Sequence, residues 1–174
     1  MALSAENQQP PVIVVMGVSG VGKTTVARLL ADRLGLPYAE ADDFHPAANI
    51  AKMRSGVPLD DEDRLPWLRA LGAWLGERSA AGTGGVVTCS ALKRRYRDVL
   101  RANCPDAWFL HLNGSHDLVG DRLAHRTGHF MPPSLLNSQY ATLEPLQADE
   151  NGTVLDVDAS PETLVERAAA ALPH

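Results

Sequence analysis

Short apolar runs alternate with longer amphipathic segments along this chain of 174 residues. The apolar runs predict buried strands at 12–16, 36–41, 86–89, 108–112 and 154–157. Between them, apolar residues recur at helical spacing, as in 23–34, where one face carries Val26, Leu29, Leu30 and Leu34. Strands that alternate with helices predict an α/β fold in three layers, in which helices flank a five-stranded parallel sheet on both faces.

Helix boundaries follow from start and stop signals in the same pattern. We expect helices at 23–34, 47–54, about 60–81, about 91–103, 115–126 and from Pro161 onward, with Ser115 and Ser160 as N-terminal caps. The glycine and prolines of 127–133 interrupt the helical period, which predicts the edge of a mobile lid at roughly 122–142. The polar segment 1–11 is predicted to be flexible and 12–174 to form a single domain.

The first predicted strand runs directly into a glycine-rich motif at 17–24, G-V-S-G-V-G-K-T, which matches G-x-x-x-x-G-K-[ST]. In such a motif backbone N–H groups and a helix N-terminus surround a polyphosphate, the lysine reaches its β- and γ-phosphates, and the hydroxyl ligates Mg²⁺. A glycine-rich turn with a solvated lysine is the simpler interpretation, but the consensus and both flanking elements favour a nucleotide site. The predicted cradle comprises Gly17, Val18, Ser19, Gly20, Val21, Gly22, Lys23, Thr24 and Thr25, with Thr24 as the metal ligand.

Composition and charge restrict the class of protein further. Hydrophobic residues make up 45% of the chain and charged residues 21%, as in ordinary globular proteins, and the net charge of −5 provides no basic surface for nucleic acid or anionic membrane. No apolar run approaches the roughly 20 residues of a membrane span, so we expect a cytoplasmic protein. Cys89 and Cys104 have no metal-ligand spacing and are expected to be reduced thiols.

Other sequence motifs distinguish among the classes of nucleotide-binding protein that carry such a cradle. No N-K-x-D guanine-binding motif is present, and the strand at 86–89 ends in Ser90 where many motor ATPases carry an acidic residue. A small-molecule kinase needs a carboxylate that accepts the proton of the substrate hydroxyl, and Asp42 or Asp43 lies beyond the second predicted strand, which we expect beside the first. Arg122 and Arg126 share a helix face, where they either clamp phosphoryl oxygens or form an ordinary solvated pair.

Several separate motifs resemble the P-loop gluconokinases, which have a fold like that of shikimate and nucleoside-monophosphate kinases. They are Asp42-x-x-His45-Pro46, Asn49-x-x-Lys52-Met53, Ser55-Gly56-x-Pro58-Leu59, Asp61-x-Asp63-Arg64, Trp67-Leu68, Cys89-Ser90-Ala91-Leu92-Lys93-x-x-Tyr96-Arg97-Asp98 and Arg126-x-Gly128-His129-Phe130. The resemblance implies transfer of the γ-phosphate of ATP to the 6-hydroxyl of D-gluconate, which gives 6-phosphogluconate for the pentose phosphate pathway. It also implies Mg²⁺, a closing lid and a homodimer.

The resemblance assigns roles to residues of this chain. Asp42 is the candidate base, and Lys23 and Arg126 complete the catalytic set. Arg126, with Arg122, contacts the ATP phosphates, and Pro161 lies near adenine. Gluconate is an anion, so its pocket needs a cation as well as polar partners. The candidates that would line it are Asp42, His45, Lys52, Arg54, Arg64, Ser90, Lys93 and His129.

Three choices stay open at this point. The family usually carries Gly-Asp before His-Pro, whereas here Ala41 replaces the glycine and Asp43 adds a second carboxylate, so either aspartate can be the base. The acceptor can be another small hydroxylated acid such as shikimate, or a nucleotide. A nucleotide-dependent binding switch without an acceptor is the alternative from a different class.

Overall fold

The computed structural model describes residues 9–18, 20–57, 59–124 and 133–173. Its centre is a five-stranded sheet in which every pairing is parallel, in the order β2-β3-β1-β4-β5. The strands are β1 (Val12–Met16), β2 (Tyr38–Glu40), β3 (Gly85–Thr88), β4 (Trp108–Asn113) and β5 (Gly152–Asp156). The predicted α/β architecture is therefore confirmed.

The position of β2 differs from the expected one. We expected β2 to lie beside β1, but β3 lies between them and pairs with both, so that Val87 is opposite Val14 on one side and Ala39 on the other. The apolar pattern of an interior strand does not specify its neighbours, because every covered strand buries both faces. Any contact between the residues after β2 and the cradle after β1 must therefore pass over the end of β3.

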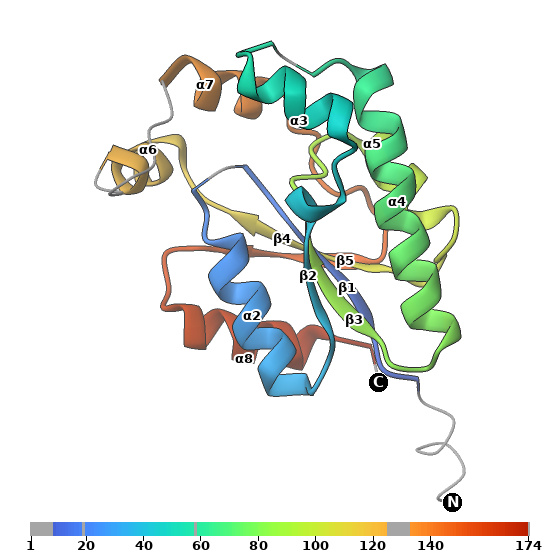
Figure 1. The fold of residues 1–174 in the computed structure, drawn as a ribbon. Helices are drawn as coiled ribbons and strands as arrows, with labels where there is room; N and C mark the ends of the chain where they lie inside the picture. Colours follow the sequence, from blue (N-terminus) through green and yellow to red (C-terminus); the bar gives the residue numbers. More distant parts are fainter. Residues whose placement is uncertain (1–8, 19, 58, 125–132, 174) are drawn as a thin grey trace, which may run out of the picture.

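Helices cover both faces of the sheet, and further helices lie beyond the carboxyl ends of its strands (Figure 1). One core cluster joins the sheet to α2 (Lys23–Leu34) and α8 (Pro161–Ala171), and a second joins its other face to α4 (Asp61–Ala80) and α5 (Arg94–Arg101). The carboxyl edge carries the 3₁₀ helix η1 (Ala41–Phe44), α3 (Ala47–Arg54), α6 (His116–Ala124) and α7 (Pro133–Thr142). In parallel α/β sheets this edge is where ligands bind.

Most helix boundaries follow the start and stop signals. Gly35 ends α2 in the left-handed conformation, and the hydroxyls of Ser115 and Ser160 accept the backbone N–H groups of Leu118 and Thr163. Asp60 forms a capping box with Asp63 at the start of α4. The predicted break at 127–133 lies outside the described residues except for Pro133. The second predicted strand ends early and turns into η1, and α7 is a helix that the sequence pattern did not predict. Pro133 is its first residue, where no intrahelical N–H is needed.

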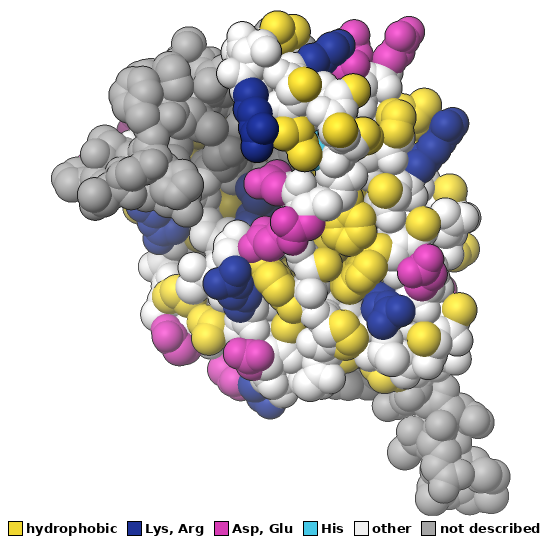
Figure 2. All heavy atoms as spheres, in the orientation of Figure 1, with side chains coloured by type: hydrophobic (Ala, Val, Ile, Leu, Met, Phe, Trp, Pro, Cys, Tyr) yellow, Lys and Arg dark blue, Asp and Glu magenta, His cyan; other side chains and the backbone are white. Residues whose placement is uncertain are grey.

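Both cysteines are buried free thiols, as expected from their spacing. Within the ranges described, no helix combines the length and apolar character needed to cross a membrane. Figure 2 shows that Lys and Arg side chains are interspersed with Asp and Glu over the face drawn, with hydrophobic side chains among them.

One histidine in the core makes the stability of the fold depend on pH. His111 in β4 is 3% exposed, and in the described part of the chain its Nδ1 has no hydrogen-bond partner. Burial, and secondarily the positive charge of Arg97, lowers its pKa from 6.5 to about 4. As the pH falls, His111 therefore binds a proton in the unfolded chain at a higher pH than in the folded protein. The free energy of unfolding falls as the pH falls from about 6.5 toward 4.

We expect the wild-type protein to lose about 2 kcal/mol of its free energy of unfolding between pH 7 and pH 5 through this group. Urea unfolding at the two pH values measures the loss, and His111→Leu should remove most of it. His116→Leu, a change of an exposed histidine, serves as the control and should keep the wild-type slope. If wild type and His111→Leu lost the same free energy of unfolding between pH 7 and pH 5, folding would not lower the pKa of His111.

Candidate active site

The glycine-rich loop between β1 and α2 has the backbone of an anion cradle. Gly17, Gly20 and Gly22 have φ angles of 146°, 90° and 95°, which L residues with side chains rarely adopt. A Cβ on Gly17 would lie 2.7 Å from the carbonyl oxygen of Leu112, so the loop packs tightly against β4. Helix α2 begins at Lys23, and its first N–H groups and positive dipole end therefore face the loop.

Some side chains of the cradle are buried in the core, and others lie where a ligand can contact them. Val18 and Val21 are 2% and 1% exposed and pack in the core, so they can offer only main-chain groups to a ligand. The ammonium of Lys23 bends back over the loop and donates to the carbonyl oxygens of Gly17 at 2.9 Å and Val18 at 3.1 Å. Thr25 is exposed, and Ser19 lies outside the described residues.

Glu40, the last residue of β2, is a site residue that the sequence patterns did not identify. Its Oε2 accepts the hydroxyl of Thr88 at 2.7 Å, and its Oε1 accepts the hydroxyl of Tyr38. Thr24, the predicted metal ligand, is among the neighbours that lower the pKa of this carboxylate. Burial opposes ionisation, but hydrogen bonds from Tyr38, Thr88 and Thr24 outweigh it and lower the pKa of Glu40. The carboxylate is therefore charged at neutral pH. Its signal in the sequence was an acidic residue at the carboxyl end of a short apolar run.

Asp42 lies on η1 at the same edge of the sheet, exposed to solvent. Hydrogen bonds at the end of β3 relate it to the cradle. The N–H of Ala41, the residue before Asp42, donates to the hydroxyl of Thr88 at 3.3 Å, and the N–H of Gly17 in the cradle donates to the carbonyl oxygen of Ser90 at 3.3 Å. The backbone next to Asp42 and the cradle therefore both contact the end of β3.

His45 follows η1 and is held by Trp67 and Asn49. Its ring stacks on Trp67 with 4.4 Å between centroids and an interplanar angle of 9°, and its Nδ1 lies 3.3 Å from the amide nitrogen of Asn49. Burial and the charge of Arg64 lower the pKa of His45, while Asp42 opposes them, so the imidazole is neutral near pH 7. A neutral histidine fixed in this way can hydrogen-bond a polyol.

Trp67 also holds the backbone next to Asp42. Its indole N–H donates to the carbonyl oxygen of Ala41 at 2.7 Å, and the residue is 8% exposed. Trp67 belongs to the core, and the same side chain holds the backbone before Asp42 and stacks on His45. Asn49, 3% exposed, donates to the carbonyl oxygen of Asp63 at 2.8 Å. Spacing alone could not reveal these roles, because they depend on contacts between α4 and the segment after β2.

The four candidate cations of the substrate pocket have different surroundings. Lys52 donates to both carboxylate oxygens of Asp63 at 2.8 Å, and Arg54 is exposed in the last turn of α3. Arg64 donates to the hydroxyl of Tyr96 at 3.2 Å, and Lys93 lies over the Tyr96 ring, 5.6 Å from its centroid. Arg64 also forms an ion pair with Asp61, with an N–O distance of 3.5 Å. Lys52 thus holds α3 to the start of α4, while Arg64 and Lys93 share the side chain of Tyr96.

The remaining predicted residues lie toward β5. Arg122 donates to the carbonyl oxygen of Val157 at 2.6 Å, just beyond β5 and close in sequence to Pro161, the first residue of α8. Arg122 is thus positioned at the loop predicted to lie near adenine. Ser90 lies directly beyond β3, and its carbonyl oxygen accepts the N–H of Gly17 at 3.3 Å. Arg126 and His129 lie outside the described residues.

The fold and this edge of the sheet define a class of protein, the P-loop kinases that phosphorylate small molecules. Comparisons with known proteins agree: the shikimate kinase family model matches residues 19–144. A gluconokinase of Gluconobacter oxydans is 50% identical over 158 residues, which cover 91% of this chain and 89% of that protein. Within the class, the chain belongs to the gluconokinase family.

Solved structures support the same assignment. The crystal structure of a sugar kinase from Janibacter sp. HTCC2649 is 54% identical, with a TM-score of 0.83 over 94% of this chain and 99% of that one. A gluconokinase structure from Sinorhizobium meliloti 1021 is 45% identical, with a TM-score of 0.84 over 95% of this chain and 93% of that one.

Proposed function

We propose that this protein is an ATP-dependent gluconokinase that transfers the γ-phosphate of ATP to the 6-hydroxyl of D-gluconate, giving 6-phosphogluconate and ADP. The observation that supports the proposal is the carboxyl edge of the sheet, which carries the cradle with Lys23 after β1, Asp42 on η1 after β2, and the turn with Lys93 after β3. Arg64 and Lys93 contribute cations in a chain whose net charge is −5, and an anionic acceptor needs such cations. Relatives that carry the name gluconokinase match nearly the whole chain.

Each residue has a chemical task in this reaction. Asp42 accepts the proton of the 6-hydroxyl as its oxygen forms a bond to the γ-phosphorus, and the bond from that phosphorus to the β,γ-bridging oxygen breaks, leaving ADP. Lys23 leaves the loop carbonyls to neutralise the β- and γ-phosphates. His45 hydrogen-bonds acceptor hydroxyls, and Arg64 and Lys93 hold the carboxylate of gluconate. Arg122 and Arg126 are assigned to the nucleotide and His129 to the acceptor.

The residues around Thr24 suit Mg²⁺. Thr24 and Glu40 bring together a hydroxyl and an ionised carboxylate at the N-terminus of α2, and oxygen donors of this kind are those that Mg²⁺ prefers. Thr24 would hold the ion and Glu40 would orient the hydroxyl. Bound Mg²⁺ supplies charge neutralisation of the phosphates.

We extend the proposal to the organisation of the protein. A homodimer with a closing lid over roughly 122–142 is the arrangement that the family resemblance suggests, and we propose a cytoplasmic location from the sequence pattern. Light scattering after size-exclusion chromatography tests the oligomeric state.

A coupled assay tests the proposed reaction. Purified protein, ATP, Mg²⁺ and D-gluconate are coupled to 6-phosphogluconate dehydrogenase, and NADPH formation is followed. We expect reduction of NADP that depends on gluconate, on ATP and on active protein, and no ADP release with shikimate or a nucleoside monophosphate as acceptor. Gluconate-independent ATP hydrolysis with no NADPH would instead indicate a nucleotide-dependent switch.

Trp67→Phe separates the hydrogen bond of Trp67 from its packing. The phenyl ring can still stack on His45, but the donor to the carbonyl oxygen of Ala41 is lost, so Asp42 is less well placed. We expect kcat with gluconate to fall about tenfold, in line with one lost buried hydrogen bond, and the KM for ATP to change little. The matched control is Trp74→Phe in the same helix, which contacts Phe44 edge-on and should keep kcat within about twofold. Equal effects of the two changes would contradict a positioning role for Trp67.

A further inference from the structure

The turn between β3 and α5, residues 90–93, contains a backbone conformation that calls for an explanation. Ala91 has a φ of 46°, and in the part of the chain that the structure describes it is the one residue other than glycine in the left-handed region. It is 2% exposed. Strained residues of this kind persist only where their surroundings hold them, and they concentrate at functional sites. On either side of Ala91 are Ser90 and Lys93, two residues assigned above to the substrate pocket.

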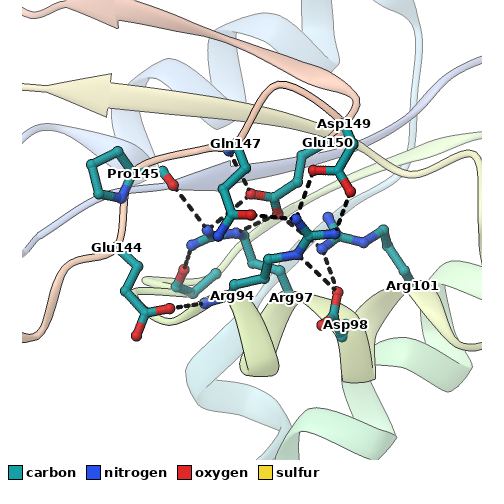
Figure 3. A network of polar contacts seen from close by, with 10 residues as sticks. Arg94, Arg97, Asp98, Arg101, Glu144, Pro145, Gln147, Asp149 and Glu150 are labelled. Carbon is teal, nitrogen blue, oxygen red and sulfur yellow. Dashed lines mark hydrogen bonds and ion pairs between the residues drawn. The ribbon is translucent and has the colours of Figure 1, made fainter.

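A buried ion pair holds the carbonyl group of this strained residue (Figure 3). Arg97 donates to the carbonyl oxygen of Ala91 at 2.9 Å and binds Glu150 through two hydrogen bonds of 2.7 and 3.0 Å. Both side chains of the pair are fully buried. The Glu150 carboxylate also accepts hydrogen bonds from the guanidinium of Arg101 at 2.8 Å and from the N–H of Gln147 at 2.8 Å. Both of its oxygens therefore have hydrogen-bond donors. The turn is thereby connected to the segment between α7 and β5.

Glu144 in the same segment makes a second connection to the turn. Its N–H donates to the carbonyl oxygen of Leu92 at 2.6 Å, and its Oε1 accepts the N–H of Arg94 at 3.0 Å. Arg94 is the first residue of α5, where N–H groups have no partner inside the helix and a carboxylate is favoured by the dipole. Figure 3 shows the Glu144 carboxylate directed at this N-terminus. Glu144 therefore fixes the backbone on both sides of Lys93.

The opposite side of the turn contacts the nucleotide cradle. The N–H of Gly17 donates to the carbonyl oxygen of Ser90 at 3.3 Å, while Lys93 reaches the Tyr96 ring beside Arg64. The turn thus lies between the phosphate cradle and the segment 143–150, which follows α7 directly in the chain. Loss of the Glu144 contact at Arg94 would displace the end of the turn that carries Lys93, while the Gly17–Ser90 hydrogen bond holds the other end against the cradle.

We propose that Glu144 is a positioning residue for the acceptor pocket: with the buried Arg97–Glu150 pair, it fixes the turn 90–93 so that Ser90 and Lys93 face gluconate. This inference rests on the proposed function for the identity of the acceptor. The Arg97–Glu150 pair is a poor target for a test, because removal of one partner leaves a buried charge and threatens the fold. Glu144 is exposed and can be changed without that risk.

The kinetic test compares three variants. Glu144→Ala removes the acceptor for the Arg94 N–H, and we expect the KM for gluconate to rise about tenfold while the KM for ATP stays within about twofold. Glu144→Gln keeps an oxygen acceptor and should restore the KM for gluconate to within about threefold of wild type. Asp149→Ala is the matched control: it removes an exposed partner of the Arg94 side chain in the same segment, at 2.6 and 2.8 Å, and touches no backbone of the turn. It should behave as wild type.

Hydrogen exchange gives a second readout that is independent of the acceptor. Glu144→Ala should speed exchange of the Arg94 amide about tenfold and leave exchange in β1 unchanged, while Glu144→Gln and Asp149→Ala should leave the Arg94 amide protected. An unchanged KM for gluconate in Glu144→Ala, or equal rises in both KM values, would overturn the proposal, as would an unchanged Arg94 exchange rate. If the wild-type protein did not phosphorylate gluconate, the proposed function would be refuted instead. The exchange rate of the Arg94 amide would then decide whether Glu144 fixes the turn.

Discussion

Asp42→Asn is expected to lower kcat for gluconate phosphorylation by roughly two to four orders of magnitude, the usual consequence of losing a general base. The amide has the same shape as the carboxylate but cannot take the proton of the 6-hydroxyl. Because Asp42 lies across the end of β3 from the cradle, ATP binding should be nearly unchanged. Steady-state kinetics in the coupled assay, with ATP affinity from calorimetry, measures both quantities.

Asp43→Asn is the matched control for this prediction. Asp43 is the neighbouring exposed carboxylate in η1, and its loss should change kcat by less than about threefold if Asp42 is the base. A large loss in Asp43→Asn together with normal turnover in Asp42→Asn would transfer the role of base to Asp43. That comparison resolves the choice that the sequence left open.

Lys23→Met should lower kcat/KM for ATP by roughly two to three orders of magnitude, as removal of one preorganised charge donor does elsewhere. The flexible methionine fills similar space but cannot neutralise the phosphates. In the folded protein the ammonium already lies over the loop, with bonds of 2.9 and 3.1 Å to Gly17 and Val18, so only a short movement is needed to reach a bound nucleotide. Phosphoryl transfer at saturating gluconate, measured over a range of ATP concentrations, provides the comparison.

Arg33→Met is the control for loss of a cation from the same helix. Arg33 forms an exposed ion pair with Glu166, with an N–O distance of 2.7 Å, and such pairs contribute little to stability. Its kinetics should match those of wild type. If Lys23→Met retained more than about a tenth of the wild-type kcat/KM for ATP, the cradle would not be acting through this lysine.

The positions of the strands and helices along the chain could be predicted because the sequence signals for them are local. The apolar runs and capping residues depend on neighbours within a few positions, and they located the strands and most helix starts. The place of β2 in the sheet was wrong in the prediction, because strand order depends on crossover connections that no local pattern records. Arg97 shows the same limit: a helix rich in arginine predicts solvated cations, and its complete burial depends on Glu150, 53 residues later in the chain.

The candidate site was predictable in part for a similar reason. The glycine-rich motif located the phosphate cradle directly, because the residues that form the cradle are consecutive in the sequence. The sequence could not rank Lys52, Arg54, Arg64 and Lys93, because each position permits either a salt bridge or a substrate contact, and only the structure shows Lys52 bound to Asp63. The roles of Glu40 and Trp67 could not be predicted, because they arise from hydrogen bonds with Thr88 and Ala41, which are distant in the sequence.

A crystal structure with D-gluconate and an unreactive ATP analogue tests the central claim most directly. We expect a carboxylate oxygen of Asp42 within hydrogen-bond distance of the 6-hydroxyl, about 2.6–3.0 Å, and Lys23 moved from the loop carbonyls to the β- and γ-phosphates. The 6-hydroxyl should lie in line with the γ-phosphorus and its leaving oxygen. Gluconate bound with its 6-hydroxyl away from the γ-phosphate, or with Asp42 turned out of the site, would contradict this account.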